Sequence, residues 1–356
     1  MIARNEEATI ARCLDSIKDI VDEIVIIDTG STDSTKEICS RYTDKIYDFP
    51  WIDDFSAARN FAFSKCTMDY IFYLDADDVL LEEDREKFMK LKASIDPNVD
   101  SVTMHYNLLS DEKGNVTFSL RRNRLVKRSR NFKWIGPVHE YLEVYGLIIN
   151  SDIAVTHKET PHEHSDRNLK IYERRLEKNE DFTPRDLYYY ANELRDHTQY
   201  EKAAEYYQKF LDTKLGWVED NIAACGKLAD IYGILKNPEK EFEYILKSFE
   251  YDAPRADFCC RMGYRFLQAN MIKQAIYWYE TATKLELPAD NWGMINHACY
   301  TWLPHLQLSV CYDRLGLHQL AYEHNEKAAE YVPEHASVKH NRSYFEKILK
   351  TQPSDS

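Results

Sequence analysis

The sequence predicts an α/β domain built on a parallel sheet, followed by an all-α domain of helical repeats. In the first half, short β-branched runs alternate with helical patterns. From Arg185 onward the strand signal vanishes and one spaced template recurs. The chain has 356 residues, about twice the usual length of one domain, so two domains are expected. We place the α/β domain at residues 1–160, a linker helix at 161–185 and the repeats at 186–350.

The α/β pattern occupies the first 78 residues. Met1-Ile2-Ala3 has the character of the end of a first strand, so we expect a few residues upstream of it. Further strands are predicted at 23–28, 45–48 and 69–74, and helices at 10–20, 34–42 and 56–65. After Asp78 a smaller antiparallel region is predicted, with strands at 102–106, 120–126, 141–144 and 148–156.

A small residue followed by alanine marks the helical repeats. The interval between them is 12 residues in three units (191 to 203, 263 to 275 and 309 to 321), and a looser unit includes Ala229. Small residues at such positions let paired helices pack closely, which is the tetratricopeptide pattern. The alternative is an irregular helical bundle, in which the shared interval would be accidental.

Composition limits the classes of partner and compartment. The net charge of -14 argues against a nucleic-acid or anionic-membrane binder, although several arginines cluster within 121–130. None of the eight cysteines forms a C-x-x-C pair, and most fall in apolar patterns, which indicates reduced thiols and a cytoplasmic protein. We find no apolar run of about 20 residues and no signal peptide, so no transmembrane segment is expected.

The sharpest chemical signal is Asp75-Ala76-Asp77-Asp78, which directly follows a predicted buried strand. Carboxylates in a D-x-D pattern at a strand end can hold a divalent ion that bridges a diphosphate. A solvated acidic turn or a helix N-cap explains the same residues without function. Ligands bind α/β sheets at the carboxyl ends of the strands, where Asp28 is also expected.

Three more motifs accompany the aspartates in series: Ala3–Glu7, Asp28–Thr35 and Phe55–Asn60. Together the four motifs resemble family 2 glycosyltransferases, which have the GT-A fold, and the match covers about residues 1–160. The whole chain is similar to bacterial members with a C-terminal tetratricopeptide domain. These include the SunS-like S-glycosyltransferases, which modify a cysteine of a bacteriocin peptide.

The resemblance implies a donor pocket lying wholly within residues 1–160. Glu6 and Asp28 would contact the uridine of a UDP-sugar, and Arg59 would face the base or the diphosphate. Asp75 would touch the ribose or the metal, Asp77 would bind Mn²⁺ or Mg²⁺, and His157 would be a third metal ligand.

Two assignments stay open at this point. His162 and His164 are competing metal ligands, and a separate zinc site formed with His157 is an alternative. Asp33 is a helix cap or a ligand, with the cap favoured.

The segment Trp134–Glu140 lies where GT-A enzymes place a catalytic carboxylate. An inverting transfer needs one base that takes the acceptor proton during attack on the anomeric carbon. Glu140 is the candidate and His139, its neighbour, is the rival. Both would be ordinary surface residues if this Gly-Pro loop has no catalytic role.

The expected activity is inverting, metal-dependent hexosyl transfer from a nucleotide-sugar to a peptide or protein side chain. A lipid-linked or cell-surface glycan precursor is an alternative acceptor. A non-catalytic repeat scaffold is an alternative of another class, and a nucleotidyltransferase would need a Gly-rich basic loop that Ala3–Glu7 does not provide. No nucleic-acid partner is expected, and a homodimer stays open.

Overall fold

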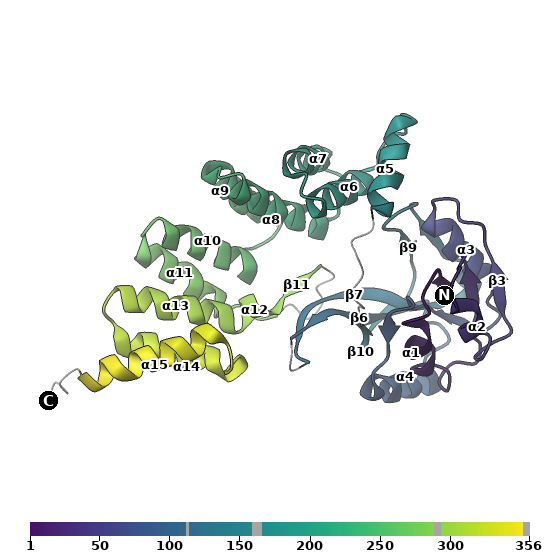
Figure 1. Cartoon of the computed structure of the whole chain (residues 1–356), viewed down its shortest axis with the longest axis horizontal. Helices are drawn as coiled ribbons and strands as arrows, with labels where there is room; N and C mark the ends of the chain where they lie inside the picture. The colour runs from purple at the N-terminus through teal and green to yellow at the C-terminus, as the bar shows by residue number, and fades with distance from the viewer. Residues whose placement is uncertain (112–113, 159–165, 288–292, 352–356) are drawn as a thin grey trace. The chain divides into compact units, whose positions relative to one another are not determined.

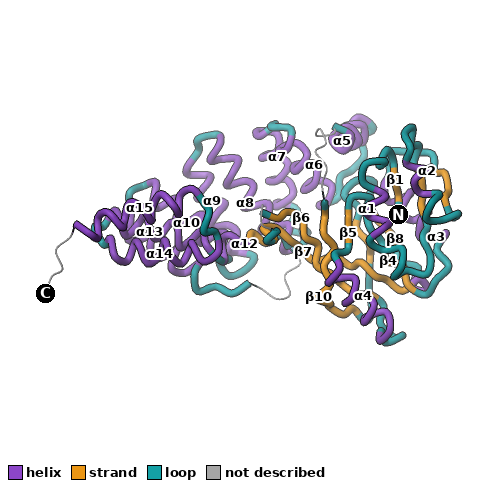
Figure 2. The backbone as a smooth tube through the Cα atoms, turned by 60° about the horizontal axis from the view of Figure 1, so that its bottom comes forward, coloured by secondary structure: helices purple, strands orange, loops and turns teal. Residues whose placement is uncertain are grey.

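The computed structural model describes residues 1–111, 114–158, 166–287 and 293–351 of the chain. It divides into two compact units, Met1–Glu193 and Leu194–Ser356. Figure 1 shows sheets and helices together in the first unit, and Figure 2 shows that helices dominate the second. The first unit therefore extends past residue 160, where the sequence predicts that the α/β domain ends.

A three-stranded parallel sheet opens the first unit. It consists of β1 (Ile2–Ala3), β2 (Ile26–Asp28) and β3 (Ile46–Asp48), in that order. The register places Ala3 beside Asp28 and Asp28 beside Asp48, so the three strands end at the same level. The intervening helices are α1 (Ile10–Asp15), α2 (Thr35–Cys39) and α3 (Phe55–Lys65).

The next strand, β4 (Tyr70–Phe72), does not join this sheet. It pairs antiparallel with β7 (Val116–Lys127), so its predicted place in the parallel sheet is wrong. The apolar run around Ile71 is buried in either arrangement, and hydrophobic periodicity does not identify the partner of a strand.

The second sheet of this unit is mixed. The strands β6 (Ser101–Ser110) and β7 form the predicted antiparallel hairpin. In contrast to the predicted antiparallel region, β10 (Ile148–His157) runs parallel to β6, and β5 (Asp78–Val79) pairs antiparallel with β10. A separate hairpin consists of β8 (Lys133–Ile135) and β9 (Tyr141–Glu143).

One apolar core joins the two sheets of the first unit. It contains Ile10 and Leu14 from α1, Ile26 from β2, and Val102 and Val155 from the mixed sheet. The remaining helices of this part of the chain are α4 (Glu82–Ser94), α5 (Arg167–Glu177) and α6 (Pro184–Asp196). This core fixes the strand ends from which the site residues project.

The second unit is an array of paired helices, as the repeat pattern predicts. Its helices are α7 (Tyr200–Asp212), α8 (Val218–Ile234), α9 (Pro238–Lys247), α10 (Ala256–Gln268), α11 (Ile272–Ala282), α12 (His297–Tyr300), α13 (Trp302–Arg314), α14 (His318–Tyr331) and α15 (Ala336–Thr351), with a two-residue strand β11 (Ile295–Asn296). Successive helices pack as the pairs α8–α9, α10–α11 and α13–α14.

The small residues of the template have a direct packing role. A Cβ atom on Gly263 would lie 2.7 Å from Cζ of Tyr279, so the ring of α11 fits against α10 because glycine stands there. Ala275, Ser309 and Ala321 are fully buried at the corresponding positions. This is the close pairing of a tetratricopeptide-like domain. None of the described helices is long and apolar enough to cross a bilayer.

Candidate active site

The aspartate cluster lies in a tight turn between β4 and β5. The amide of Asp78 donates to the carbonyl of Asp75 at 3.1 Å, and the amide of Asp75 donates to Oδ2 of Asp78 at 3.0 Å. Strand β5 then pairs with the end of β10, and the register places Asp78 directly beside His157. Backbone pairing therefore brings a distant histidine to the aspartates.

In the described part of the chain, Asp77, Asp78 and His157 form a group of three potential metal ligands. Their ligand atoms lie within 4.8 Å of one another. Nδ1 of His157 is 3.5 Å from Oδ1 of Asp77 and 3.7 Å from Oδ1 of Asp78. The nearby carboxylates of Asp77 and Asp78 raise the pKa of His157 to about 10.

The chemistry of this group fits a divalent cation. Oδ1 of Asp78 is buried and has no hydrogen-bond partner among the described residues, although buried carboxylate oxygens normally have one. Two carboxylates and one imidazole are a donor set that suits Mn²⁺. Sequence reasoning did not include Asp78 among the potential ligands, because its position depends on the pairing of β5 with β10.

A buried arginine fixes Asp78 from behind. Nη2 of Arg124 lies 3.1 Å from Oδ2 of Asp78, and both side chains are inaccessible to solvent. The guanidinium lies against the rings of Tyr73 and Tyr106, at 5.1 and 4.3 Å from their centroids. Because a buried ion pair holds one oxygen of Asp78, the other oxygen is directed toward His157.

Asp75, which was predicted to touch the ribose or the metal, lies apart from the three potential metal ligands. Its Oδ1 pairs with Nη2 of Arg59 at 2.8 Å, and it is not part of the ligand group with His157. Burial alone would raise the pKa of Asp75, but Arg59 and Arg124 hold it well below its usual value. Nε of Arg59 contacts Oε1 of Glu140, and its guanidinium lies 4.8 Å from the ring centroid of Trp134.

Two cavities meet at Arg59. The first, of about 140 Å³, lies at the ends of the parallel strands and is lined by Glu6, Thr29, Trp51, Phe55, Arg59, Asp75, Asp77 and Arg167, among others. The second, of about 210 Å³, is lined by Phe55, Arg59, Arg122, Val138, His139, Glu140, Asn168, Arg185 and Tyr189. Phe55 and Arg59 line both, so the predicted base Glu140 and the aspartates face adjoining spaces.

Residues 1–151 match the family described as Glycosyl transferase family 2. The N-terminal part of the chain is a family 2 glycosyltransferase domain. A "TPR repeat-containing protein" of Synechococcus elongatus is 37% identical over 145 residues, which cover 40% of this chain and 34% of that protein. The "SPbeta prophage-derived glycosyltransferase SunS" of Bacillus subtilis is 28% identical over 224 residues, which cover 60% of this chain and 52% of that protein. The chain thus spans between a third and about half of the length of these relatives.

Among solved structures, that of YrrB, "a TPR protein with an unusual peptide-binding site", has 17% sequence identity and a TM-score of 0.38. It matches 50% of this chain and 83% of that chain.

The family 2 domain places most of the predicted donor residues together. Glu6, Arg59, Asp75 and Asp77 all line the first cavity. Asp28 is outside this lining: its carboxylate is buried and accepts hydrogen bonds from the amides of Gly30 and Ser31, while the adjacent Thr29 lines the cavity. Asp28 therefore holds the turn after β2.

The first cavity extends beyond residue 160, the predicted limit of the donor pocket. Arg167, at the start of α5, lines the first cavity, and its guanidinium lies 4.6 Å from the ring centroid of Phe55. Asn168 and Arg185 line the second cavity. His162 and His164, the competing metal ligands, lie outside the described residues. Asp33 accepts from the amide of Thr35 at 3.0 Å, although the N-cap residue of α2 is Ser34 and not Asp33 as favoured from the sequence.

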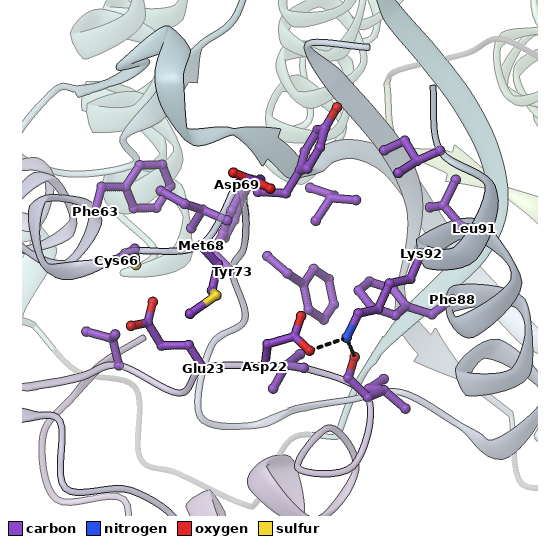
Figure 3. A pocket seen from close by; sticks show the side chains of 18 of the residues that line it. Asp22, Glu23, Phe63, Cys66, Met68, Asp69, Tyr73, Phe88, Leu91 and Lys92 are labelled. Carbon is purple, nitrogen blue, oxygen red and sulfur yellow. Dashed lines mark hydrogen bonds and ion pairs between the residues drawn. The ribbon is translucent and has the colours of Figure 1, made fainter. Parts of the chain in front are cut away.

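A larger cavity, of about 420 Å³, lies at the opposite ends of the strands. Figure 3 shows Phe63, Tyr73, Phe88 and Leu91 around it, together with an ion pair between Lys92 and Asp22 at 2.8 Å. Its lining is mainly apolar and includes none of the aspartates of the D-x-D turn. In α/β sheets ligands bind at the carboxyl ends of the strands, so this cavity lies away from the edge where a donor is expected.

Proposed function

We propose that this chain is an inverting glycosyltransferase that moves a hexose from a nucleotide-sugar, with UDP-sugars favoured, to a side chain of a peptide or protein. The observation that carries this proposal is the double contact of Arg59, with Asp75 in the first cavity and with Glu140 in the second. One guanidinium thus joins a donor space to an acceptor space and sets their orientation.

Asp77, Asp78 and His157 would hold a divalent cation, which neutralises charge on the departing diphosphate when bound. The imidazole in the donor set favours Mn²⁺ over Mg²⁺, because Mg²⁺ prefers oxygen ligands alone. Arg124 supports this group from the core through its buried pair with Asp78.

Glu140 is the proposed general base. The acceptor heteroatom bonds to the anomeric carbon as the bond from that carbon to the diphosphate oxygen breaks, and Glu140 takes the acceptor proton. Its Oε1 contacts Nε of Arg59, which holds the carboxylate in the second cavity. The nucleoside diphosphate leaves as an anion, and Arg167 adds positive charge beside its cavity.

A peptide or protein acceptor is favoured by the second unit. Stacked helix pairs form extended surfaces that bind peptides. Tyr264 on α10 and Tyr277 on α11 are 53% and 64% exposed, and tyrosine is enriched at protein interfaces. The cytoplasm remains the predicted compartment.

The test is a mass-spectrometric screen of UDP-sugars with peptide mixtures and Mn²⁺, comparing wild type with Asp77→Asn. Transfer by the wild type alone supports the proposal. Donor hydrolysis without peptide transfer would favour a glycan precursor as acceptor. If neither hydrolysis nor transfer occurs with any donor, the chain is a non-catalytic scaffold.

A further inference from the structure

Helix α6 presents a stripe of three side chains to the loop that carries Glu140. Arg185, Tyr189 and Glu193 are spaced four residues apart, so they lie on one face of the helix. All three contact the same residue, His139, which directly precedes Glu140 in the chain.

The three contacts hold different parts of His139. Arg185 donates from Nε and Nη2 to the carbonyl oxygen of His139, at 3.1 and 2.9 Å. The ring of Tyr189 stacks on the imidazole, with centroids 4.4 Å apart and planes inclined by 17°. Glu193 places Oε1 at 2.6 Å from Nε2, and Asn168 donates to the same carboxylate oxygen at 3.2 Å. Backbone, ring face and ring edge are therefore all fixed.

The backbone of this loop needs such support. His139 has φ of 50°, in the left-handed region that residues other than glycine adopt uncommonly. Conformations of this kind persist where surrounding contacts determine them. The amide of Phe55 also donates to the carbonyl of Pro137 at 2.8 Å. The direction in which Glu140 leaves the loop follows from the conformation of His139.

We infer that Arg185, Tyr189 and Glu193 are positioning residues, which fix His139 and through it direct Glu140 at the acceptor atom. This inference rests on the proposed function of Glu140 as the base. It assigns part of α6 to the transfer reaction, although the sequence places this helix in the repeats. A displacement of the base by about 1 Å can cost on the order of 100-fold in rate.

The test compares truncating and conservative substitutions in the full chain. Tyr189→Ala and Glu193→Ala should each lower kcat of acceptor glycosylation by roughly 10- to 100-fold and leave the donor KM within about twofold. Tyr189→Phe keeps the stacked ring and should restore kcat to near the wild-type value. Glu177→Gln, an exposed position on α5, is the matched control and should have no effect.

A positioning role also predicts non-additive losses. In a Glu140→Gln background, Glu193→Ala should cause little further loss, since there is no base left to position. If Tyr189→Ala and Glu193→Ala lower the melting temperature but leave kcat unchanged, their role is structural and the inference is wrong. If His139→Ala stops transfer while Glu140→Gln stays active, His139 is itself the base.

A second measurement separates this inference from the proposed function. The NMR signal of the His139 imidazole, identified by its loss in His139→Gln, should carry a ring-current shift from Tyr189. Tyr189→Ala should remove this shift and Tyr189→Phe should keep it. If the wild type shows the shift but has no transferase activity, the proposed transfer reaction is refuted. The positioning of His139 by Tyr189 is then still supported. If the signal does not change in Tyr189→Ala, the positioning of His139 by Tyr189 is refuted.

Discussion

Glu140→Gln removes the proposed base with little change in shape. The Glu140 side chain is only 10% exposed, and its Oε1 contacts Nε of Arg59. A glutamine keeps an oxygen that can accept this hydrogen bond, so the loop and Arg59 should stay in place. What is lost is the negative charge and the capacity to accept a proton.

The expected loss follows from general-base catalysis. Removing such a base costs about two to four orders of magnitude in rate, equivalent to about 3 to 5 kcal/mol in the barrier. The donor KM should hardly change, because the lining of the first cavity includes Glu6 and Asp77 but not Glu140. The effect should therefore lie in kcat for acceptor glycosylation.

The size of the loss also reports on the acceptor atom. A cysteine thiol with a pKa near 8.5 is about 3% ionised at pH 7 and half ionised at pH 8.5. Raising the pH over this range should rescue Glu140→Gln by about 15-fold if the acceptor is a thiol, because the thiolate needs no base. A hydroxyl acceptor stays protonated, so it should show little rescue.

Initial rates measured by mass spectrometry at several pH values give both quantities. Glu143→Gln, at an exposed position on β9, is the control for an equal change of charge nearby. Full activity of Glu140→Gln on every acceptor would refute the assignment of the base. If His139→Ala is then inactive, His139 is the base instead of Glu140.

The remaining predictions concern the metal, the limits of the domain and the repeats. A chelator should abolish wild-type transfer and added Mn²⁺ should restore it, whereas Asp77→Asn should stay inactive at saturating Mn²⁺. If Asp77→Asn is active within a few-fold of wild type, Asp77 has no metal role. A chain cut after residue 165 should lose donor hydrolysis, because Arg167 lines the first cavity, where the donor is proposed to bind. Full hydrolysis by this fragment would show that α5 is dispensable. Gly263→Ala should destabilise the second unit by about 1 to 3 kcal/mol in thermal denaturation, since the new Cβ would meet the buried ring of Tyr279. Gly233→Ala is its control, because the nearest atom to the new Cβ would be 3.7 Å away, and equal melting temperatures for the two variants would contradict the packing argument.

Local patterns in the sequence were sufficient for most elements of the fold. Apolar runs that end in turn residues mark β2 and β3, and the small-residue interval finds the helix pairs. Pairing between distant strands could not be obtained in this way. The partner of β4 and the parallel direction of β10 beside β6 depend on contacts across more than 40 residues. Periodicity describes the faces of a strand and carries no information about its neighbour.

The same limit applies to the carboxylates of the site. A D-x-D turn after a buried strand identifies the region, but its three aspartates have different surroundings in the fold. Asp75 faces Arg59 across 16 residues, and Asp78 faces His157 because β5 pairs with β10. The carboxylate of Asp28 accepts hydrogen bonds from backbone amides of the turn that follows β2. Residue type and spacing predicted a group of acidic residues. Which partner each of these carboxylates contacts depends on the tertiary structure.

Helix α6 shows why the repeat pattern concealed a part of the site. The template is formed by buried positions, and at α6 it includes Ala191, next to Tyr190, which packs against Tyr172 and Phe182. The other face carries the stripe with Tyr189 at its centre, and the template of small and apolar positions does not include that face. Its four-residue spacing was visible in the sequence, but arginine, tyrosine and glutamate at such spacing are also typical of a solvated helix face. The stripe can be interpreted only when the residue that it contacts is known. Here that residue is His139, which lies next to the candidate base Glu140.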